Sequence, residues 1–188
     1  DLRTLLAVPG ATLEEALQRA ETTTALLDGL VARGQLQGYD SPSDLLPSQA
    51  TQARRQAALP RDDVLRSRLQ EATRGGRLQA QAFEPFLADV AASRARAPLG
   101  PDHYAGTVLG AWLDAQIVRS ADGVTVLVLL RGAPQPDRMR ALLQAGGAPP
   151  GVRLIDLQGD VEQLVAQYRQ RALQAALAGT ACIFLVLV

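Results

Sequence analysis

Two strand–helix–strand patterns, one near each end of the chain, most constrain the fold of this protein. In the first, residues 4–8 predict a strand and residues 36–39 a short return strand, with an amphipathic helix between them. Thr12 and Glu15 have the spacing of a capping box, which satisfies backbone N–H groups at a helix start. Gly34 is expected to end the helix, because glycine adopts the left-handed conformation without a Cβ clash.

The second pattern follows a hairpin signal. Residues 124–130 are apolar on both faces, as expected of a central strand that is covered on two sides. Asp122 and Gly123 precede this run and predict a tight turn, since the pair tolerates positive φ. Residues 137–145 predict a short helix, and residues 152–157 predict the return strand. The helix residues expected to face inward are Met139, Leu142 and Leu143.

Together the two patterns predict an α+β fold with a ferredoxin-like sheet of the split βαβ type. Residues 4–8 and residues 124–130 are then neighbouring strands of one sheet. Right-handed crossovers place the helices of both units on the same face of that sheet.

The segment at residues 43–110 has a different character and predicts a helical insertion. Helix-like stretches are broken at Pro60, and a later stretch carries apolar residues at i, i+3, i+4 and i+7. Those residues are Phe83, Phe86, Leu87 and Val90. Such an insertion must cover the open face or an edge of the sheet, or present a surface to a neighbouring domain.

Residues that could carry chemistry are few. His103 is the only histidine, so no second imidazole exists for a metal site, and we interpret it as a loop or capping residue. We therefore expect His103→Ala to leave the protein's function nearly unchanged. Cys182 is the only cysteine and lies in an apolar run, which indicates burial in lipid or core. The formal net charge of zero gives no electrostatic footprint for nucleic acid.

Serines, acids and paired glycines in the sequence favour structural roles. Ser41, Ser43 and Ser48 lack a nucleophile-elbow setting, which favours turns and helix N-caps. The acid pairs Glu14-Glu15 and Asp62-Asp63 open predicted helices, where the helix dipole favours negative charge. The glycine pairs Gly75-Gly76 and Gly146-Gly147 follow predicted helices and act as helix stops.

Two aromatic residues, Tyr104 and Trp112, favour packing over a ligand platform. From these residues we predict no catalytic site, no cofactor site and no metal site.

The C-terminal part of the sequence changes pattern at Ala172. Asp160 and Gln163 predict a helix start, followed by an amphipathic stripe, whereas residues 172–188 are apolar all round apart from Gln174 and Thr180. At about 1.5 Å per residue this run covers roughly 25 Å, slightly less than a hydrocarbon core of roughly 30 Å. A buried core helix, a tail anchor and a membrane helix are the three alternatives. We favour one helix over residues 160–188, with a domain at residues 1–171 and the start of a transmembrane helix at residues 172–188.

Three stretches of the sequence resemble predicted exporters of the MMPL type. They are GATLEEALQRAE at residues 10–21, GYDSPSDLLPSQATQ at residues 38–52, and YRQRAL at residues 168–173. The stretch at residues 38–52 is the most specific. These exporters belong to the resistance-nodulation-division (RND) superfamily of bacterial inner-membrane transporters.

The resemblance implies a role and a location. It implies that the chain is a porter-type domain, the second of two periplasmic domains, followed by the start of the eighth membrane helix. It also implies proton-driven export across the bacterial inner membrane, with proton-relay carboxylates in membrane helices outside this chain. The implied cargo is hydrophobic, either lipid-like or an aryl-polyene. The implied partners are the remaining domains and membrane helices of the same transporter.

Two other classes of function stay open. The runner-up is a tail-anchored membrane protein whose soluble domain binds a protein partner. The third is an enzyme such as an acyl-binding hydrolase, which would need a nucleophile next to a base. Because the sequence offers no such pair, we do not expect an enzyme.

Overall fold

The computed structural model describes residues 4–76 and 79–157 of the 188-residue chain. Within these residues the protein is a mixed α/β fold with a five-stranded antiparallel sheet. Of the described residues, 4–8, 22–41 and 127–157 belong to one compact unit. The remaining described residues, 9–21, 42–76 and 79–126, belong to a second unit.

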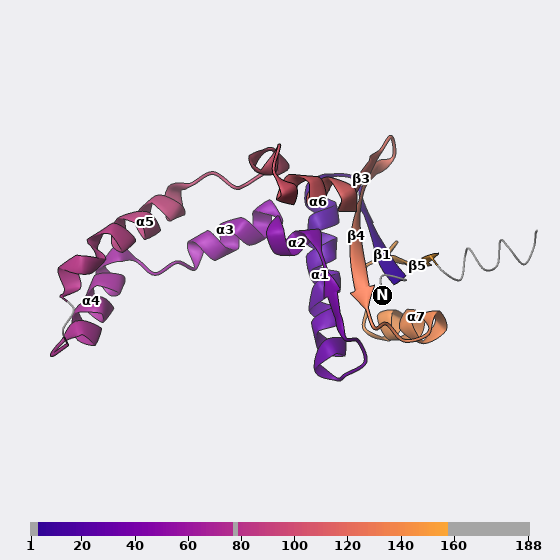
Figure 1. The fold of residues 1–188 in the computed structure, drawn as a ribbon, viewed down its shortest axis with the longest axis horizontal. Helices are drawn as coiled ribbons and strands as arrows, with labels where there is room; N and C mark the ends of the chain where they lie inside the picture. The colour runs from indigo at the N-terminus through magenta and orange to yellow at the C-terminus, as the bar shows by residue number, and fades with distance from the viewer. Residues whose placement is uncertain (1–3, 77–78, 158–188) are drawn as a thin grey trace, which may run out of the picture. The chain divides into compact units, whose positions relative to one another are not determined.

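The sheet is built from both ends of the chain (Figure 1). Its strands are β1 (Thr4–Gly10), β2 (Gly38–Asp40), β3 (Ile117–Ser120), β4 (Gly123–Arg131) and β5 (Arg153–Asp156). Their order is β2-β4-β1-β5, and β3 pairs with β4. The predicted pairing of residues 4–8 with the strand at residues 124–130 is therefore confirmed.

Strand β4 alternates in burial along its length. Val126, Val128 and Leu130 are fully buried, whereas Leu127 and Leu129 between them are half-buried. The prediction of a strand covered on two sides is therefore confirmed for one face, and the described residues cover the other face only in part. An antiparallel sheet needs only one face packed on a core, and this strand has one dry face and one partly covered face.

The predicted turn and cap residues lie at the β3–β4 hairpin and at the two ends of the first helix. Gly123 has a φ of 138° in the hairpin between β3 and β4. Helix α1 (Leu13–Ala32) begins where Thr12 Oγ1 accepts a hydrogen bond from the Glu15 N–H at 3.2 Å. Gly34, with a φ of 66°, follows the end of that helix.

The return strand β2 starts at Gly38, two residues later than the sequence pattern predicts. Its position is fixed by pairing with β4, in which Gly38 lies opposite Arg131 and Asp40 opposite Leu129. Tyr39 is held by a 2.5 Å hydrogen bond to Asp28 of α1. The start of β2 is therefore set by non-local contacts.

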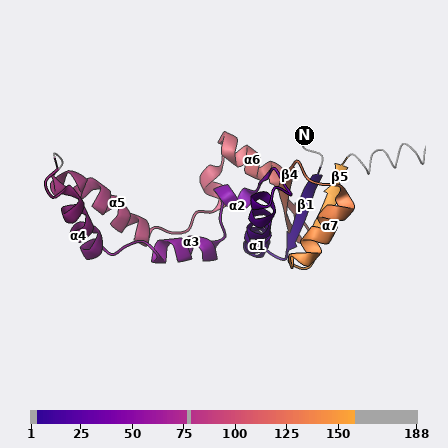
Figure 2. The ribbon, with the colours of Figure 1, turned by 90° about the horizontal axis from the view of Figure 1, so that it is seen from below.

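Helices occupy residues 43–110, for which a helical insertion is predicted, and the last of them continues beyond that segment to Gln116. They are α2 (Pro42–Leu45), α3 (Gln49–Ala57), α4 (Asp62–Thr73), α5 (Glu84–Ala95) and α6 (Val108–Gln116), with 3-10 turns η1 (Ala80–Phe83) and η2 (Pro101–Tyr104). Pro60 lies between α3 and α4, as the sequence predicts. Helices α4 and α5 lie side by side and form a helical hairpin (Figure 2).

This hairpin buries few of its apolar side chains. Of the predicted apolar stripe only Leu87 is buried; Phe86 is 48% exposed and Phe83 lies in the turn before α5. A continuous buried stripe needs a partner along the whole helix, and within the described residues only α3, α4 and η1 make more than slight contact with α5. The helix that this periodicity predicts is present from Glu84 on, but of the four apolar residues only Leu87 is buried.

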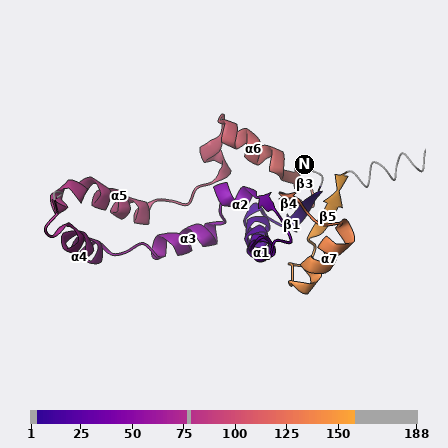
Figure 3. The ribbon, with the colours of Figure 1, turned by 60° about the horizontal axis from the view of Figure 1, so that its bottom comes forward.

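Helix α7 (Pro136–Ala145) packs beside β5 (Figure 3). Met139 and Leu143 are buried, as predicted, and Leu142 is half-buried. At the end of this helix, a Cβ on Gly146 would lie within 2.5 Å of the Leu26 side chain of α1. Glycine at this position therefore permits the close approach of α7 to α1.

Several predictions concern the C-terminal residues and lie outside the described part. These are the helix over residues 160–188, the domain limit at residue 171, the membrane segment at residues 172–188, and the environment of Cys182. Among residues 4–76 and 79–157, no helix combines the length and the apolar character needed to cross a bilayer.

Candidate functional site

The N-terminus of α3 receives several hydrogen bonds from α1 in the second unit. Ser48 is the N-cap of this helix, and its hydroxyl oxygen accepts a hydrogen bond from the Thr51 N–H at 3.1 Å. The sequence predicts this capping role for Ser48. Ser48 and Thr51 are both buried, although each carries a polar side chain that needs a partner.

A carboxylate from α1 provides that partner. Glu21 accepts hydrogen bonds from the Ser48 N–H at 2.7 Å, the Ser48 hydroxyl at 2.8 Å and the Thr51 hydroxyl at 2.6 Å. Charged acceptors at a helix N-terminus also interact favourably with the helix dipole. Glu21 therefore fixes the start of α3 against α1.

A second carboxylate of α1 binds the next turn. Glu14 accepts hydrogen bonds from the Gln49 N–H at 2.7 Å and the Ala50 N–H at 3.1 Å, and from the Gln18 side chain at 2.8 Å. Partial burial raises the pKa of Glu14, but these hydrogen bonds together lower it more, so its pKa lies below the ordinary value of 4.5. The two glutamates form what we call the carboxylate clamp, Glu14 and Glu21.

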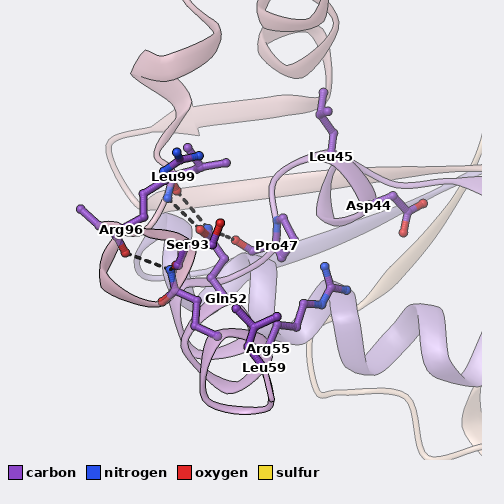
Figure 4. Close-up of a pocket in the computed structure, with 11 residues that line it drawn as sticks. Asp44, Leu45, Pro47, Gln52, Arg55, Leu59, Ser93, Arg96 and Leu99 are labelled. Atoms are coloured by element: carbon purple, nitrogen blue, oxygen red, sulfur yellow. Dashed lines mark hydrogen bonds between the residues drawn. The ribbon is translucent and has the colours of Figure 1, made fainter. Parts of the chain in front are cut away.

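Beyond the clamp, α3 forms one wall of a groove with a volume of about 380 Å³ (Figure 4). The opposite wall is the last turn of α5 and the extended segment that follows it. The lining residues are Asp44, Leu45, Pro47, Gln52, Arg55, Gln56, Leu59, Ser93, Arg96, Ala97 and Leu99. Its volume lies at the lower end of the range for small-molecule sites, which is about 300–1,000 Å³.

Two glutamines join the walls of the groove. Gln52 donates to the carbonyl oxygens of Pro47 and Leu99, at 2.8 and 3.0 Å, and accepts from the Leu99 N–H at 2.7 Å. One turn later, Gln56 donates to the carbonyl oxygens of Arg96 and Ser93, at 2.9 and 3.3 Å. Figure 4 shows Gln52 between Pro47 and Leu99. These bonds occupy backbone polar groups that would otherwise face the groove.

The charged residues of the lining differ in their contacts. The guanidinium groups of Arg55 and Arg96 form no hydrogen bond or ion pair within residues 4–76 and 79–157, and both side chains are exposed. Asp44 already has an interaction partner. The groove therefore combines an apolar interior with two arginines whose charges are available to a ligand.

His103 lies outside this groove and has the capping role that the sequence predicts. The residue is exposed at the end of η2, and its Nδ1 accepts a hydrogen bond from the Gly100 N–H at 3.0 Å. Among the described residues, the hydrogen-bond partner of the His103 ring is the backbone of Gly100, and no serine, threonine or cysteine side chain is hydrogen-bonded to the ring.

The other residues considered in the sequence also have structural contacts. Ser41 directly precedes α2 and Ser43 lies within it, and both are buried. The acid pairs lie in the first turns of α1 and α4. Tyr104 donates a hydrogen bond from its hydroxyl to the Leu45 carbonyl at 3.0 Å, which agrees with a packing role. In the part of the chain that the structure describes, no cluster of three or more histidine, cysteine or acidic residues could hold a metal ion.

Sequence reasoning did not identify the residues of the groove. Gln52 and Gln56 are four residues apart, so they lie on one face of α3, with Arg55 beside them. This spacing was a usable signal. Arg96 gave none, because its contact with α3 depends on how α5 folds back over residues distant in sequence.

No protein-family model, no curated protein and no solved structure matches this chain.

Proposed function

We propose that this chain is the second periplasmic domain of a proton-driven bacterial inner-membrane exporter of the MMPL type, within the RND superfamily. Its sheet is then a ferredoxin-like, porter-type sheet, and its cargo is lipid-like or an aryl-polyene. The domain itself carries out no catalysis. Proton movement through carboxylates in membrane helices elsewhere in the protein supplies the energy.

The observation that carries this proposal is the order of the strands. Each of the two strand–helix–strand patterns begins with a central strand: β1 and β4 are neighbours in the middle of the sheet. The strands that end the two patterns, β2 and β5, lie on the outer sides of this pair. A split βαβ sheet has this order. The approach of Gly146 after α7 to Leu26 of α1 supports helices on the same face of the sheet.

The sequence resemblance adds a second line of support. Its most specific stretch, residues 38–52, runs from β2 to the start of α3 and contains Ser48 and Thr51. The stretch at residues 10–21 contains both glutamates of the carboxylate clamp. The residues that resemble exporters are thus in direct contact with one another through the clamp.

The test is an export measurement in the bacterium that encodes the chain. Deleting the reading frame should cause acyl lipid or aryl-polyene pigment to accumulate in the inner membrane and to decrease in the outer membrane. The intact gene should restore the distribution. An unchanged distribution in the deletion strain would refute the exporter.

A tail-anchored protein that binds a protein partner is the second candidate. The observation that favours it is the α4–α5 hairpin, in which α4 has no buried residue and Phe86 of α5 is 48% exposed. Chemical cross-linking in intact cells separates the two. An exporter predicts cross-links from the hairpin to other parts of the same polypeptide, whereas the anchored protein predicts cross-links to a different protein.

A further inference from the structure

The sheet has an edge at β5, in the first compact unit. Within the described residues, β5 pairs with β1 on one side and has no strand on its other side. An edge strand presents backbone N–H and C=O groups that can pair with another extended chain. Because these groups are common to all residues, the edge selects an extended backbone, and nearby side chains select its sequence.

A pocket with a volume of about 380 Å³ lies beside this edge. It is formed by α7, β5 and the loop between them, and the helix and the strand lie side by side (Figure 3). Most of its lining is apolar, namely Leu143, Ala148, Pro149, Val152 and Leu154. Val152 and Leu154 are only half-buried, so the α7 side of the edge has room for further apolar side chains.

The side chains of β5 alternate between the two faces of the sheet. Leu154 lies opposite Leu6 of β1, and Arg153 lies opposite Ala7. Since successive residues of a strand point to opposite faces, Arg153 belongs to the face away from the one that Val152 and Leu154 share. Arg153 is exposed on that face. The edge therefore combines an apolar pocket on one face with a positive charge on the other.

A chain that pairs with β5 distributes its own side chains in the same way. Its residues beside Val152 and Leu154 point into the pocket, which favours apolar side chains. The residue between them lies beside Arg153, which favours an acidic side chain, because opposite charges on neighbouring strands attract. The second arginine of the lining, Arg140, is already paired with Asp137 at 2.7 Å.

We propose that β5 and this pocket bind an extended peptide segment of another protein, with the sequence pattern apolar–acidic–apolar. The segment adds one strand to the sheet beside β5. The pattern reads the same in both directions, so it applies to a parallel and to an antiparallel segment. The inference goes beyond the exporter proposed above and does not depend on it.

A second copy of the chain complements this edge less well. Two copies that pair symmetrically through β5 are related by an axis perpendicular to the sheet, so residues of the same face lie opposite each other. Asp156 lies opposite Thr4 and shares the face of Leu154. It therefore cannot lie opposite Arg153 of the other copy. The charges of the edge thus favour a different protein.

The test is fluorescence anisotropy of the full chain in lipid nanodiscs with a fluorescein-labelled peptide, Gly-Ser-Val-Glu-Val-Ser-Gly. We expect this peptide to bind, and we expect a peptide with Lys in place of Glu to bind about tenfold more weakly. Ser in place of both valines should also weaken binding, because serine does not fill the pocket. N-methylation of the valine and glutamate backbone nitrogens should abolish it, since strand pairing needs these donors. Equal binding of any of these peptides would overturn the proposal.

A charge reversal at the edge tests the role of Arg153 without touching the core. Arg153→Glu should reverse the preference, so that the peptide with Lys binds more tightly than the peptide with Glu. The matched control is Arg138→Glu on α7, which changes an exposed arginine outside the pocket and should keep the original preference. An unchanged preference in Arg153→Glu would overturn the pairing of charges.

Hydrogen exchange of the full chain locates the bound peptide. The Val-Glu-Val peptide should slow exchange of the backbone amides at residues 152–156 and leave β2, at the opposite edge of the sheet, unchanged. Protection at β2 alone would place the peptide elsewhere and overturn the site. Protection of β5 that increases with protein concentration in the absence of peptide would show that a second copy covers the edge, and would likewise overturn the proposal.

Discussion

The central strands of the sheet and the α4–α5 hairpin are stabilised by different forces. In the strands β1 and β4, Leu6, Val8, Val126, Val128 and Leu130 have at most 1% of their surface exposed. In the hairpin, α4 buries no residue and α5 buries only Leu87. Burial of apolar surface is the main favourable contribution to folding, so the strands receive most of it.

The two helices of the hairpin are joined by ion pairs in place of a buried apolar interface. Arg66 of α4 pairs with Glu84 of α5, and Arg94 of α5 pairs with Asp62 of α4. Exposed ion pairs contribute little, because water and salt screen them. In addition, the Nε of Arg94 is buried without a hydrogen-bond partner in the described part of the chain, which is unfavourable.

This difference predicts that the hairpin opens locally while the sheet stays folded. The last turn of α5 and the segment after it form one wall of the groove. Local opening of the hairpin would therefore move this wall at small cost, while the carboxylate clamp keeps the opposite wall, α3, in place.

The largest effect is expected for a truncation in the sheet. Leu6→Ala removes fully buried methyl groups and should reduce the free energy of unfolding by about 2–5 kcal/mol. The measurement is urea unfolding followed by tryptophan fluorescence. Leu69→Ala on α4 is the matched control, because this leucine is only half-buried and should cost much less. Equal losses for the two variants would contradict the difference between the regions.

The carboxylate clamp should give the next largest effect. Glu21→Ala removes three hydrogen bonds at the start of α3 and should reduce the free energy of unfolding by about 1.5–3 kcal/mol. The control is Glu71→Ala on α4, whose carboxylate has no partner among the described residues. If both variants are equally stable in urea, the clamp does not stabilise the domain.

Acid should weaken the clamp through Glu14. Its pKa in the folded protein lies below the ordinary value of 4.5, so its contribution to stability is fully present above that value. The contribution is lost as the pH falls below 4.5 and through the folded pKa. Urea unfolding from pH 7 to pH 3 should therefore show a smaller loss of stability for Glu14→Gln than for the unchanged protein. Identical pH dependence would contradict this role.

The smallest effect concerns the ion pair of the hairpin. Glu84→Gln removes the partner of Arg66, but both groups are exposed to water. We expect the urea midpoint to stay within the error of the measurement at both low and high salt. A clear loss at low salt that disappears at high salt would show that the hairpin depends on this pair.

The sheet could be predicted from the sequence because its signals are local. The Asp122-Gly123 turn, the stop at Gly34 and the apolar run at residues 124–130 each specify the structure of their own segment. The start of β2 could not be predicted, since pairing with Arg131 sets it. Sequence patterns of this kind contain no information about register between distant strands.

The candidate site was harder to predict from the sequence, because its contacts join residues that are distant in the chain. Ser48 has the local pattern of an N-cap, and this role was predicted. Its partner Glu21 lies 27 residues away, and Glu14 lies 35 residues from Gln49. Glu14 has the local pattern of a helix start, and only the packing of α1 against α3 shows its second role.

Native-state hydrogen exchange tests the central difference between the two regions most directly. Backbone amides of β1 and β4 should exchange only through global unfolding, whereas those of α4 and α5 should exchange about a hundredfold faster or more, through local opening. Equal protection of the hairpin and the central strands would contradict the account, because it would mean that the polar hairpin unfolds only together with the apolar sheet.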